Sequence, residues 1–276
     1  MSYRKTKAFL KLAAATALLL GLCSCSMFYT DTVQTVSQDS NDAPLFTKPQ
    51  SSEESSGTEN SFLSDVKKAA EKNKDTVGWL YIPSTDINNS VLQAFDNSFY
   101  IRRDEQRNDS VYGCYFVDCD SPIGTAQEFG RNTIIYGHSD LKDSPDGKRF
   151  SQLFKFADPA FAEKTPNIYF TTAQQDLVWR VFAVFYTKTS FHYIQTEPSD
   201  TQFERLLEKA KEGSLYDYDV EVTTADKILT LSTCSVKYGN DGTGRLVVMA
   251  RLLREGEKPD DAPKPPVKNP DSKLVE

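Results

Sequence analysis

Short apolar runs rich in β-branched and aromatic residues recur along the middle of this chain, separated by glycine, proline and polar clusters. Such runs predict strands, because branched and aromatic side chains pack well on a pleated surface. The predicted strands are residues 78–82, 91–93, 111–116, 133–136, 167–170, 177–186, 227–231 and 245–252. No segment repeats another, so we expect one strand-rich domain.

Two segments depart from this pattern and show the spacing of an amphipathic helix. Asn60 or Ser61 is placed to cap the first helix. Its apolar side would carry Phe62, Leu63, Val66, Ala69 and Ala70. The second segment runs from Pro198 to Gly213. Its apolar positions are Phe203, Leu206, Leu207 and Ala210, with charged residues between them. The fold predicted from the pattern is therefore mainly β, with one helix near the N-terminus and another before the last strands.

The N-terminal segment, residues 1–30, has the pattern of a membrane signal. Four basic residues precede an uncharged stretch that runs from Leu12 to Tyr29; they are Arg4, Lys5, Lys7 and Lys11. This length is near the lower limit for a transmembrane helix, and the charge order favours a cytoplasmic N-terminus. A cleaved secretory signal and a lipoprotein processing site with Cys25 lipidated are the alternatives. The three interpretations predict a single-pass anchor, secretion or a lipid anchor, respectively. All three place the body of the chain outside the cytoplasm.

Two further segments have the composition of disordered chain. Residues 31–60 are rich in serine, threonine and acidic residues and predict a stalk that cannot bury enough apolar surface to fold. Residues 255–276 are proline-rich and charged and predict a disordered tail. One folded domain, residues 61–254, remains between them.

Charge and cysteine content exclude several classes of protein. The formal net charge of the 276 residues is -7, and the body of the chain has no basic stripe, so we expect no nucleic-acid partner. Cys114 and Cys119 would point to opposite faces of a strand and are expected to be small buried residues. No cysteine and histidine spacing suits zinc, and we expect neither metal nor cofactor.

The candidate chemistry lies at three strand ends. Cys234 follows an apolar run, His138 follows another after Tyr136 and Gly137, and Arg245 opens a third. A thiolate nucleophile needs a nearby group that generates or stabilises it, and an acyl-transfer site needs a donor for the developing oxyanion. We therefore predict Cys234 as nucleophile, His138 as proton carrier and Arg245 as oxyanion stabiliser.

These residues also have plainer interpretations. His192, the only other histidine, lies in a polar and aromatic loop and is a weaker candidate. Arg245 could be an edge charge that keeps a sheet soluble. Arg251 shares its strand face but lies at the far end and is expected to be structural. The order histidine, cysteine, arginine fits papain-like proteases poorly, and the caspase signature is absent.

Three motifs resemble those of sortases, the membrane-anchored transpeptidases of Gram-positive bacteria. They are Thr-Leu-Ser-Thr-Cys ending at Cys234, Ile-Ile-Tyr-Gly-His ending at His138, and the strand Arg245 to Leu252. Residues 77–83 and 87–93 are similar to the entry strands of the family, over a resemblance that spans about 62–253. The two helices resemble class B in particular.

The resemblance implies an eight-stranded β-barrel and a class B cysteine transpeptidase in residues 61–254. Such an enzyme cleaves a C-terminal sorting signal after a threonine, forms a thioacyl-enzyme, and transfers the surface protein to a peptidoglycan precursor of the lipid II type. Asn88, Ser232 and Thr233 are candidate substrate contacts. Ser139 departs from the second histidine of many class B members, and Ser90 departs from a common proline.

Three alternatives remain open from the sequence. The enzyme could polymerise pilin subunits with a lysine acceptor, or it could be a hydrolytic cysteine protease. It could also be a non-catalytic surface barrel that binds extended peptides.

Overall fold

The computed structural model describes residues 61–140, 142–261 and 263–276. The predicted membrane segment and stalk therefore lie outside the described residues, as does Cys25. Within the described ranges, none of the helices combines the length and the apolar character that a bilayer crossing requires.

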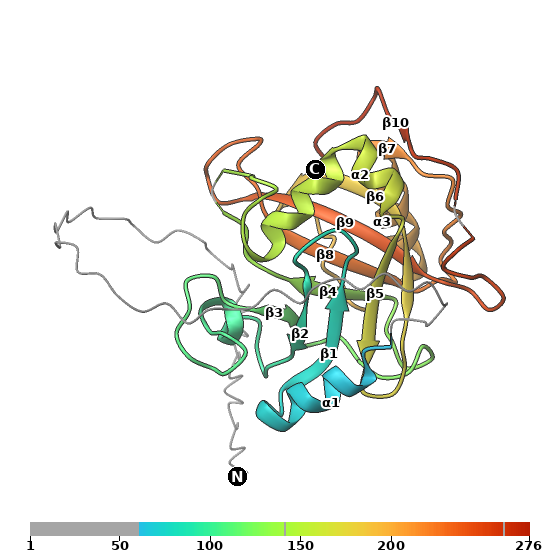
Figure 1. The fold of residues 1–276 in the computed structure, drawn as a ribbon. Coiled ribbons are helices and arrows are strands. Elements are labelled where there is room, and N and C mark those ends of the chain that lie inside the picture. Colours follow the sequence, from blue (N-terminus) through green and yellow to red (C-terminus); the bar gives the residue numbers. More distant parts are fainter. Residues whose placement is uncertain (1–60, 141, 262) are drawn as a thin grey trace, which may run out of the picture.

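Eight strands close into a barrel in the order β1-β2-β3-β4-β8-β9-β6-β5, as Figure 1 shows. Their bounds are β1 Thr76–Tyr81, β2 Asn88–Leu92, β3 Tyr115–Val117, β4 Asn132–Tyr136, β5 Asn167–Thr172, β6 Val178–Lys188, β8 Ile228–Cys234 and β9 Gly244–Leu252. The β2–β3 and β4–β8 pairs are parallel, and the other neighbours are antiparallel. The prediction of an eight-stranded, mainly β barrel is confirmed.

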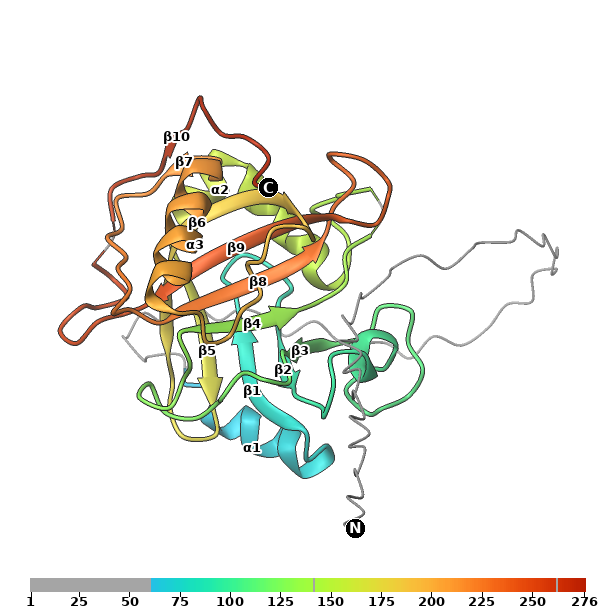
Figure 2. The ribbon, with the colours of Figure 1, turned by 180° about the vertical axis from the view of Figure 1, so that it is seen from behind.

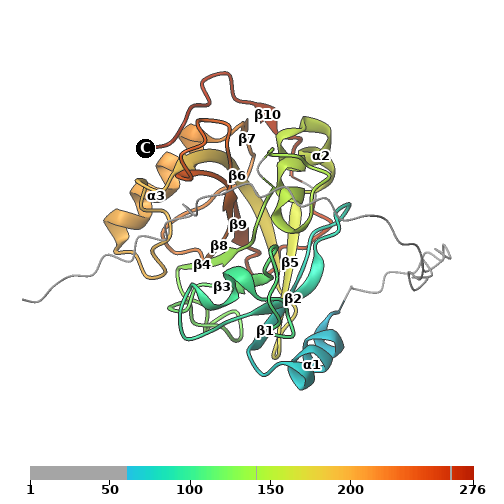
Figure 3. The same cartoon turned by 90° about the vertical axis from the view of Figure 1, so that its left-hand side faces the viewer.

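Helices lie around the outside of this barrel. Helix α1 (Leu63–Lys72) lies beside β1, and α3 (Asp200–Gly213) runs beside β6 in the view of Figure 2. Helix α2 (Pro159–Lys164) lies apart from both α1 and α3, as the side view of Figure 3 shows. Two 3-10 segments, η1 (Phe99–Arg102) and η2 (Arg149–Ala157), complete the helical part. Both predicted helices are present, while η1, η2 and α2 were not predicted.

The predicted start of the first helix is wrong in detail. Helix α1 begins after Phe62, and no side chain caps it. The Ser61 hydroxyl and the Phe62 N–H both donate to the Asp176 carboxylate instead. A distant acidic side chain thus takes over the polar groups that a local cap would have satisfied.

The predicted strand at 111–116 is also shorter than expected. Only Tyr115–Val117 pair as β3, because Ser110 to Gly113 form a turn in which Gly113 has a φ of +54°. Val111 is 74% exposed there. Val111 and Tyr112 have the composition of a strand, but the turn exposes both side chains to solvent.

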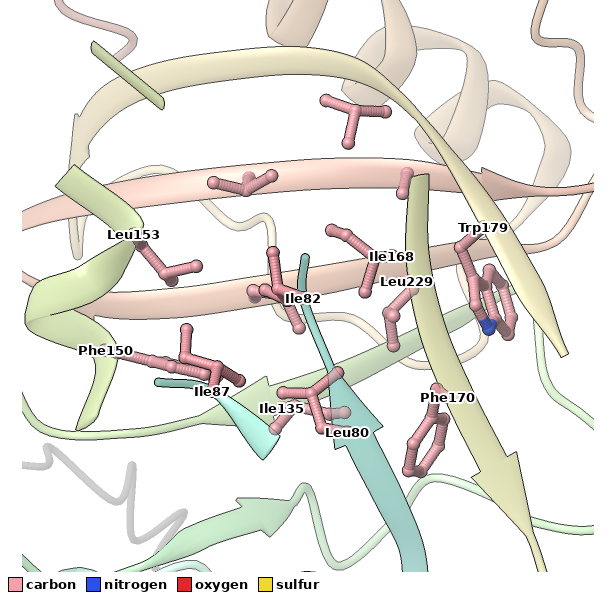
Figure 4. Packing of buried hydrophobic residues seen from close by; sticks show 14 of the residues in the cluster. Leu80, Ile82, Ile87, Ile135, Phe150, Leu153, Ile168, Phe170, Trp179 and Leu229 are labelled. Carbon is pink, nitrogen blue, oxygen red and sulfur yellow. The ribbon is translucent and has the colours of Figure 1, made fainter. Parts of the chain in front are cut away.

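The barrel interior is filled by apolar side chains from every wall (Figure 4). Phe150 and Leu153 of η2 are fully buried. They pack in one cluster with Ile82, which follows β1, and with the strand residues Ile135 and Leu229. Burying a side chain of this size stabilises the fold by about 1.5–3 kcal/mol. The η2 segment is therefore part of the core and fixes the loop that follows β4.

The described part of residues 255–276 corrects the prediction of a disordered tail. Val267–Lys268 form a short strand, β10, which pairs with β7 (Tyr216–Asp217). Farther on, Val275 is 4% exposed and its N–H donates to Tyr186 O at 3.0 Å. The tail thus returns along the outside of the barrel to β6.

A few specific contacts outweigh the polar composition of the tail. The side chain of Val275 lies against Gly213, where an added Cβ would come within 2.1 Å of it. The Thr187 hydroxyl donates to Val275 O at 2.7 Å. Composition is a property of the whole segment, so it does not reveal the contact between the single residues Val275 and Gly213.

Candidate active site

Strand register brings the three predicted residues to one end of the barrel. In the parallel pair β4–β8, Tyr136 lies opposite Ser232 as the last pair. His138 and Cys234 each follow two residues later. In the antiparallel pair β8–β9, Cys234 lies directly opposite Arg245. The order along the barrel wall at this end is therefore histidine, cysteine, arginine.

The pleat places the cysteine and the arginine on the outer face of the barrel. Leu231 and Leu246 belong to the barrel core. Successive side chains of a strand point to opposite faces, so Cys234, three residues after Leu231, and Arg245, one before Leu246, point outward. An extended peptide can approach this outer face.

Cys234 is the residue at which β8 emerges from the core. The six preceding residues of β8 are buried, whereas Cys234 is half-buried. The other described cysteines differ: Cys114 is fully buried, and burial raises the pKa of its thiol far above the ordinary value. Burial also raises the pKa of the Cys119 thiol. The thiolate is therefore disfavoured at both of these alternatives.

His138 is held by a backbone carbonyl. Its Nε2 lies 2.6 Å from Ile101 O, and because a carbonyl oxygen only accepts, Nε2 carries the hydrogen. Burial lowers the pKa of His138 below its ordinary 6.5; the Arg102 and Arg149 charges add to this, and the Ile101 bond opposes it. A neutral imidazole at neutral pH leaves Nδ1 as the basic atom. His192, in contrast, is exposed in the loop between β6 and α3.

Arg245 is anchored by carbonyl oxygens. Its Nη1 donates to Gly242 O and Gly244 O, both at 2.8 Å. Among the described residues, no carboxylate lies within ion-pair distance of its guanidinium. A guanidinium has five N–H donors, so this arrangement fixes the group and leaves donors for an anionic or carbonyl oxygen.

Ser232 fixes the loop that packs on the outer face beside Cys234 and Arg245. Its hydroxyl lies 2.8 Å from the Tyr193 hydroxyl, and both residues are buried. Asn132 on β4 donates to Tyr193 O and Gln195 O at 2.9 Å each. These contacts hold the β6–α3 loop against β4 and β8, which gives a peptide at Cys234 a wall on that side. The wall depends on Tyr193 and Asn132, which were not singled out from the sequence.

Thr233 points inward. It is 2% exposed, and its hydroxyl donates to Gly137 O at 2.8 Å. A side chain at position 137 would meet the Phe150 ring at 2.8 Å, so glycine is required where the chain passes η2. The side chains of Ser232 and Thr233 thus hold the site together, and their predicted contact with substrate stays a prediction.

Asn88 lies farther round the barrel, on β2. Three strand spacings separate β2 from β8, about 14 Å at the usual distance between neighbouring strands. The Asn88 Oδ1 accepts a hydrogen bond of 2.7 Å from Trp79 Nε1. A direct substrate role for Asn88 remains a prediction.

Several residues around the histidine carried no short-range sequence signal. Glu105 forms a half-buried ion pair with Arg149 at 2.5 Å and accepts from Asn89 at 3.0 Å. Arg149 has a φ of +56°, and the N–H of the next residue, Phe150, donates to His138 O at 2.8 Å. The pair thus joins the η1 region and η2 around His138. Only the fold brings these segments together.

One cluster in the described residues has the composition of a cation site. Ligand atoms of Asp118, Cys119 and Asp120 lie within 4.8 Å of one another. The Asp118 carboxylate already accepts from Asn97 and Tyr136. Hydrogen bonds therefore account for the buried member of the cluster, Asp118.

Comparison with known proteins gives one consistent result. The family model for the sortase domain matches residues 80–253, well over half of the chain. Sortase B of Listeria monocytogenes is 34% identical over 210 residues, which cover 76% of this chain and 81% of the relative.

Solved structures agree with this result. A Staphylococcus aureus sortase B–substrate complex is 31% identical with a TM-score of 0.62, covering 70% of this chain and 86% of that one. Sortase B complexed with triglycine has the same identity and TM-score, with coverage of 70% and 87%. With the strand-end cysteine, histidine and arginine on an eight-stranded barrel, these matches establish that the chain belongs to the sortase family, as a class B sortase and cysteine transpeptidase.

Proposed function

We propose that this enzyme cleaves a sorting signal after a threonine, holds the surface protein as a thioester on Cys234, and transfers it to an amine of a peptidoglycan precursor. The observation that carries this proposal is the strand register that sets Cys234 opposite Arg245 and beside the His138 loop. Acyl transfer needs a nucleophile, a proton carrier and an oxyanion donor at one place.

The first half-reaction forms the thioester. His138 Nδ1 accepts the thiol proton, and Sγ of Cys234 attacks the threonine carbonyl carbon. Arg245 donates to the oxygen as it becomes negative; one such donor is worth about 10²–10³-fold in rate. The C–N bond then breaks, and His138 returns the proton to the leaving amine. Burial of His138, which favours the neutral imidazole, supports its role as the initial base.

The second half-reaction releases the product. An acceptor amine attacks the thioester carbonyl while His138 removes its proton. Arg245 stabilises the second oxyanion, and the C–S bond breaks to regenerate the thiol. The product is a new amide, so no net hydrolysis occurs when the amine outcompetes water.

The acceptor and the location of the enzyme are part of the proposal. Relatives with bound substrate and with bound triglycine support a peptide donor and an amine acceptor. We infer that the amine belongs to a lipid II-type precursor and that residues 1–30 anchor the enzyme in the cell membrane, with its catalytic domain outside. Holding enzyme and lipid-linked acceptor in one plane raises their effective concentration. Lipidation at Cys25 is the alternative anchor.

The rival functions differ in what they release. A pilin polymerase would join the peptide to a lysine side chain, and a hydrolase would give the free acid whatever amine is added. A peptide-binding barrel would give no covalent adduct.

Mass spectrometry of the purified domain, residues 61–276, tests the proposal. A sorting-peptide library is added first without amine and then with wall-precursor peptide or a pilin lysine peptide. We expect an acyl adduct on Cys234 that the wall-precursor amine resolves. Cys234→Ala should form neither adduct nor product, and the control Cys119→Ala should retain both. Full activity of Cys234→Ala would refute the proposal.

A further inference from the structure

The backbone ladder between the two catalytic loops stops before it reaches the catalytic residues. Tyr136 and Ser232 are the last pair of β4 and β8, two residues before His138 and Cys234. Beyond them the Gly137 N–H reaches Ser232 O only at 3.4 Å. The alignment of the histidine with the cysteine therefore depends on what holds the two loops after their strands end.

Side chains continue the connection. Ser139, directly after His138, donates from its hydroxyl to Cys234 O at 2.6 Å. This bond ties the backbone of the nucleophile to the residue beside the proton carrier. Together with the Thr233 bond to Gly137 O, it links the two loops at the level of the catalytic residues.

Asp143 makes the outermost link. Its Oδ2 accepts from the Ser235 hydroxyl at 2.7 Å, and its Oδ1 and Oδ2 accept from the Val236 N–H at 3.0 and 3.1 Å. Hydrogen bonds to an ionised carboxylate are stronger than bonds between neutral groups. The carboxylate thus holds the turn that follows Cys234.

The backbone of Asp143 supports this interpretation. Its φ is +53°, a left-handed conformation that costs a residue other than glycine on the order of 1 kcal/mol. Described residues on both sides of it are held as well: Asp140 accepts from the Lys142 and Ser144 N–H groups at 3.1 Å, and its own N–H donates to Ser151 of η2. A strained, half-buried aspartate on an anchored loop is thus presented to the cysteine turn.

We propose that Asp143 is a positioning residue of the transpeptidase, whose carboxylate holds the Cys234 turn against the His138 loop and so aligns nucleophile and proton carrier. The inference rests on the roles proposed above for Cys234 and His138. Asp143 acts through these residues and needs no contact with substrate. Ser139 is its partner in the same alignment.

Kinetics of two Asp143 variants test the proposal. A misplacement of about 1 Å can cost on the order of 10²-fold in rate. We expect Asp143→Ala to lower kcat and the single-turnover rate of Cys234 acylation by about 10²-fold, with KM changed less than about twofold. Asp143→Asn keeps one oxygen acceptor and should recover about a tenth of the wild-type rate. Asp146→Asn is the matched control, because Asp146 is exposed on the same loop; it should behave as wild type.

The outcomes separate this proposal from the one it rests on. If Cys234→Ala, measured in parallel, remains active, the proposed function fails. If activity needs Cys234 but both Asp143 variants keep the wild-type kcat, only the positioning role fails. A lower melting temperature with unchanged kcat, or a loss confined to KM, would also overturn it. Should Asp143→Ala not fold, Asp143→Asn and Ser139→Ala decide, and both must lower the acylation rate.

Discussion

The two ends of β9 carry the same residue type in two different settings. Arg245 and Arg251 lie six residues apart on one strand face, opposite Cys234 and Ile228 of β8. Arg251 is nearly buried, with 4% of its side chain exposed, and donates twice to Glu257 at 2.8 Å. Arg245 is half-buried and donates to carbonyl oxygens only among the described residues. Arg251 is therefore engaged in a structural ion pair, whereas Arg245 keeps N–H donors for a ligand.

The segment that follows or precedes each arginine explains the difference. After Arg251 the chain turns, and the Arg254 N–H also donates to Glu257 at 2.7 Å, so the carboxylate is held against β9. Before Arg245 the loop also contains a carboxylate, Asp241, but this accepts from Thr243 and lies 4.0 Å from Lys188. An acidic residue in the neighbouring loop therefore does not by itself form an ion pair with the arginine. The hydrogen bonds of its carboxylate decide which cation it contacts.

The comparison predicts its largest effect for Arg245→Lys. Lysine cannot reproduce the planar fork, so kcat/KM should fall by about 10²-fold while the free energy of unfolding changes by less than about 0.5 kcal/mol. Peptide cleavage and urea titration measure the two quantities. Wild-type rates would reduce Arg245 to a structural residue.

The matched change at the other end, Arg251→Ala, should act on stability instead. It removes two charged hydrogen bonds and is expected to lower the free energy of unfolding by about 2 kcal/mol. The loss falls short of that for a fully buried pair, because Glu257 stays in contact with water. Below the melting temperature kcat/KM should stay within about twofold of wild type, and a tenfold loss would contradict the assignment of the two ends.

Acid titration sharpens the same contrast. The hydrogen bonds from Arg251 lower the pKa of Glu257 to about 2, against an ordinary 4.5. Because the folded-state pKa is depressed, the unfolded state binds more protons between these values, and stability is lost as the pH falls from about 4.5 towards 2. Glu257→Gln should flatten this decline in thermal melts. An unchanged pH profile in the variant would show that the ion pair contributes nothing.

The smallest effect is expected for His192→Ala. This variant tests whether the second histidine near the catalytic end of the barrel takes part in the reaction. His192 is exposed in the β6–α3 loop, so kcat should remain within about twofold of wild type. His138→Ala is the positive control, with an expected loss of about 10²-fold or more. A large loss at His192 would mean that His192, and not His138, carries the proton.

Prediction from the sequence succeeded unevenly across the molecule. Strands and the α3 helix followed from local periodicity, because the side chains that make the pattern are the ones that pack. The η2 segment, the hydrogen bonds just before α1 and the docked tail did not, because each depends on a partner far along the chain: the barrel core, Asp176 and Gly213. Periodicity within a short segment of sequence cannot indicate partners that lie far away in the chain.

The site divides in the same way. Cys234, His138 and Arg245 could be named because each ends or opens an apolar run and because their motifs resemble a family. The roles of Ser139, Asp143 and Tyr193 could not be predicted, since serine, aspartate and tyrosine in loops are common. Their importance lies in their hydrogen bonds to Cys234, Ser235 and Ser232, which sequence spacing does not encode.

The sequence by itself determined the strand-rich architecture and the identity of the three reactive groups, because alternating side chains and the chemistry of a thiol, an imidazole and a guanidinium are local properties. Only the tertiary structure decided which arginine keeps its donors, which loops hold the cysteine, and where the tail docks. The tail and the loops depend on contacts between segments far apart in the chain, and the two arginines depend on how the turns next to β9 fold. Closing the barrel sets the strand register that places Cys234 opposite Arg245, because each strand pairs with both of its neighbours.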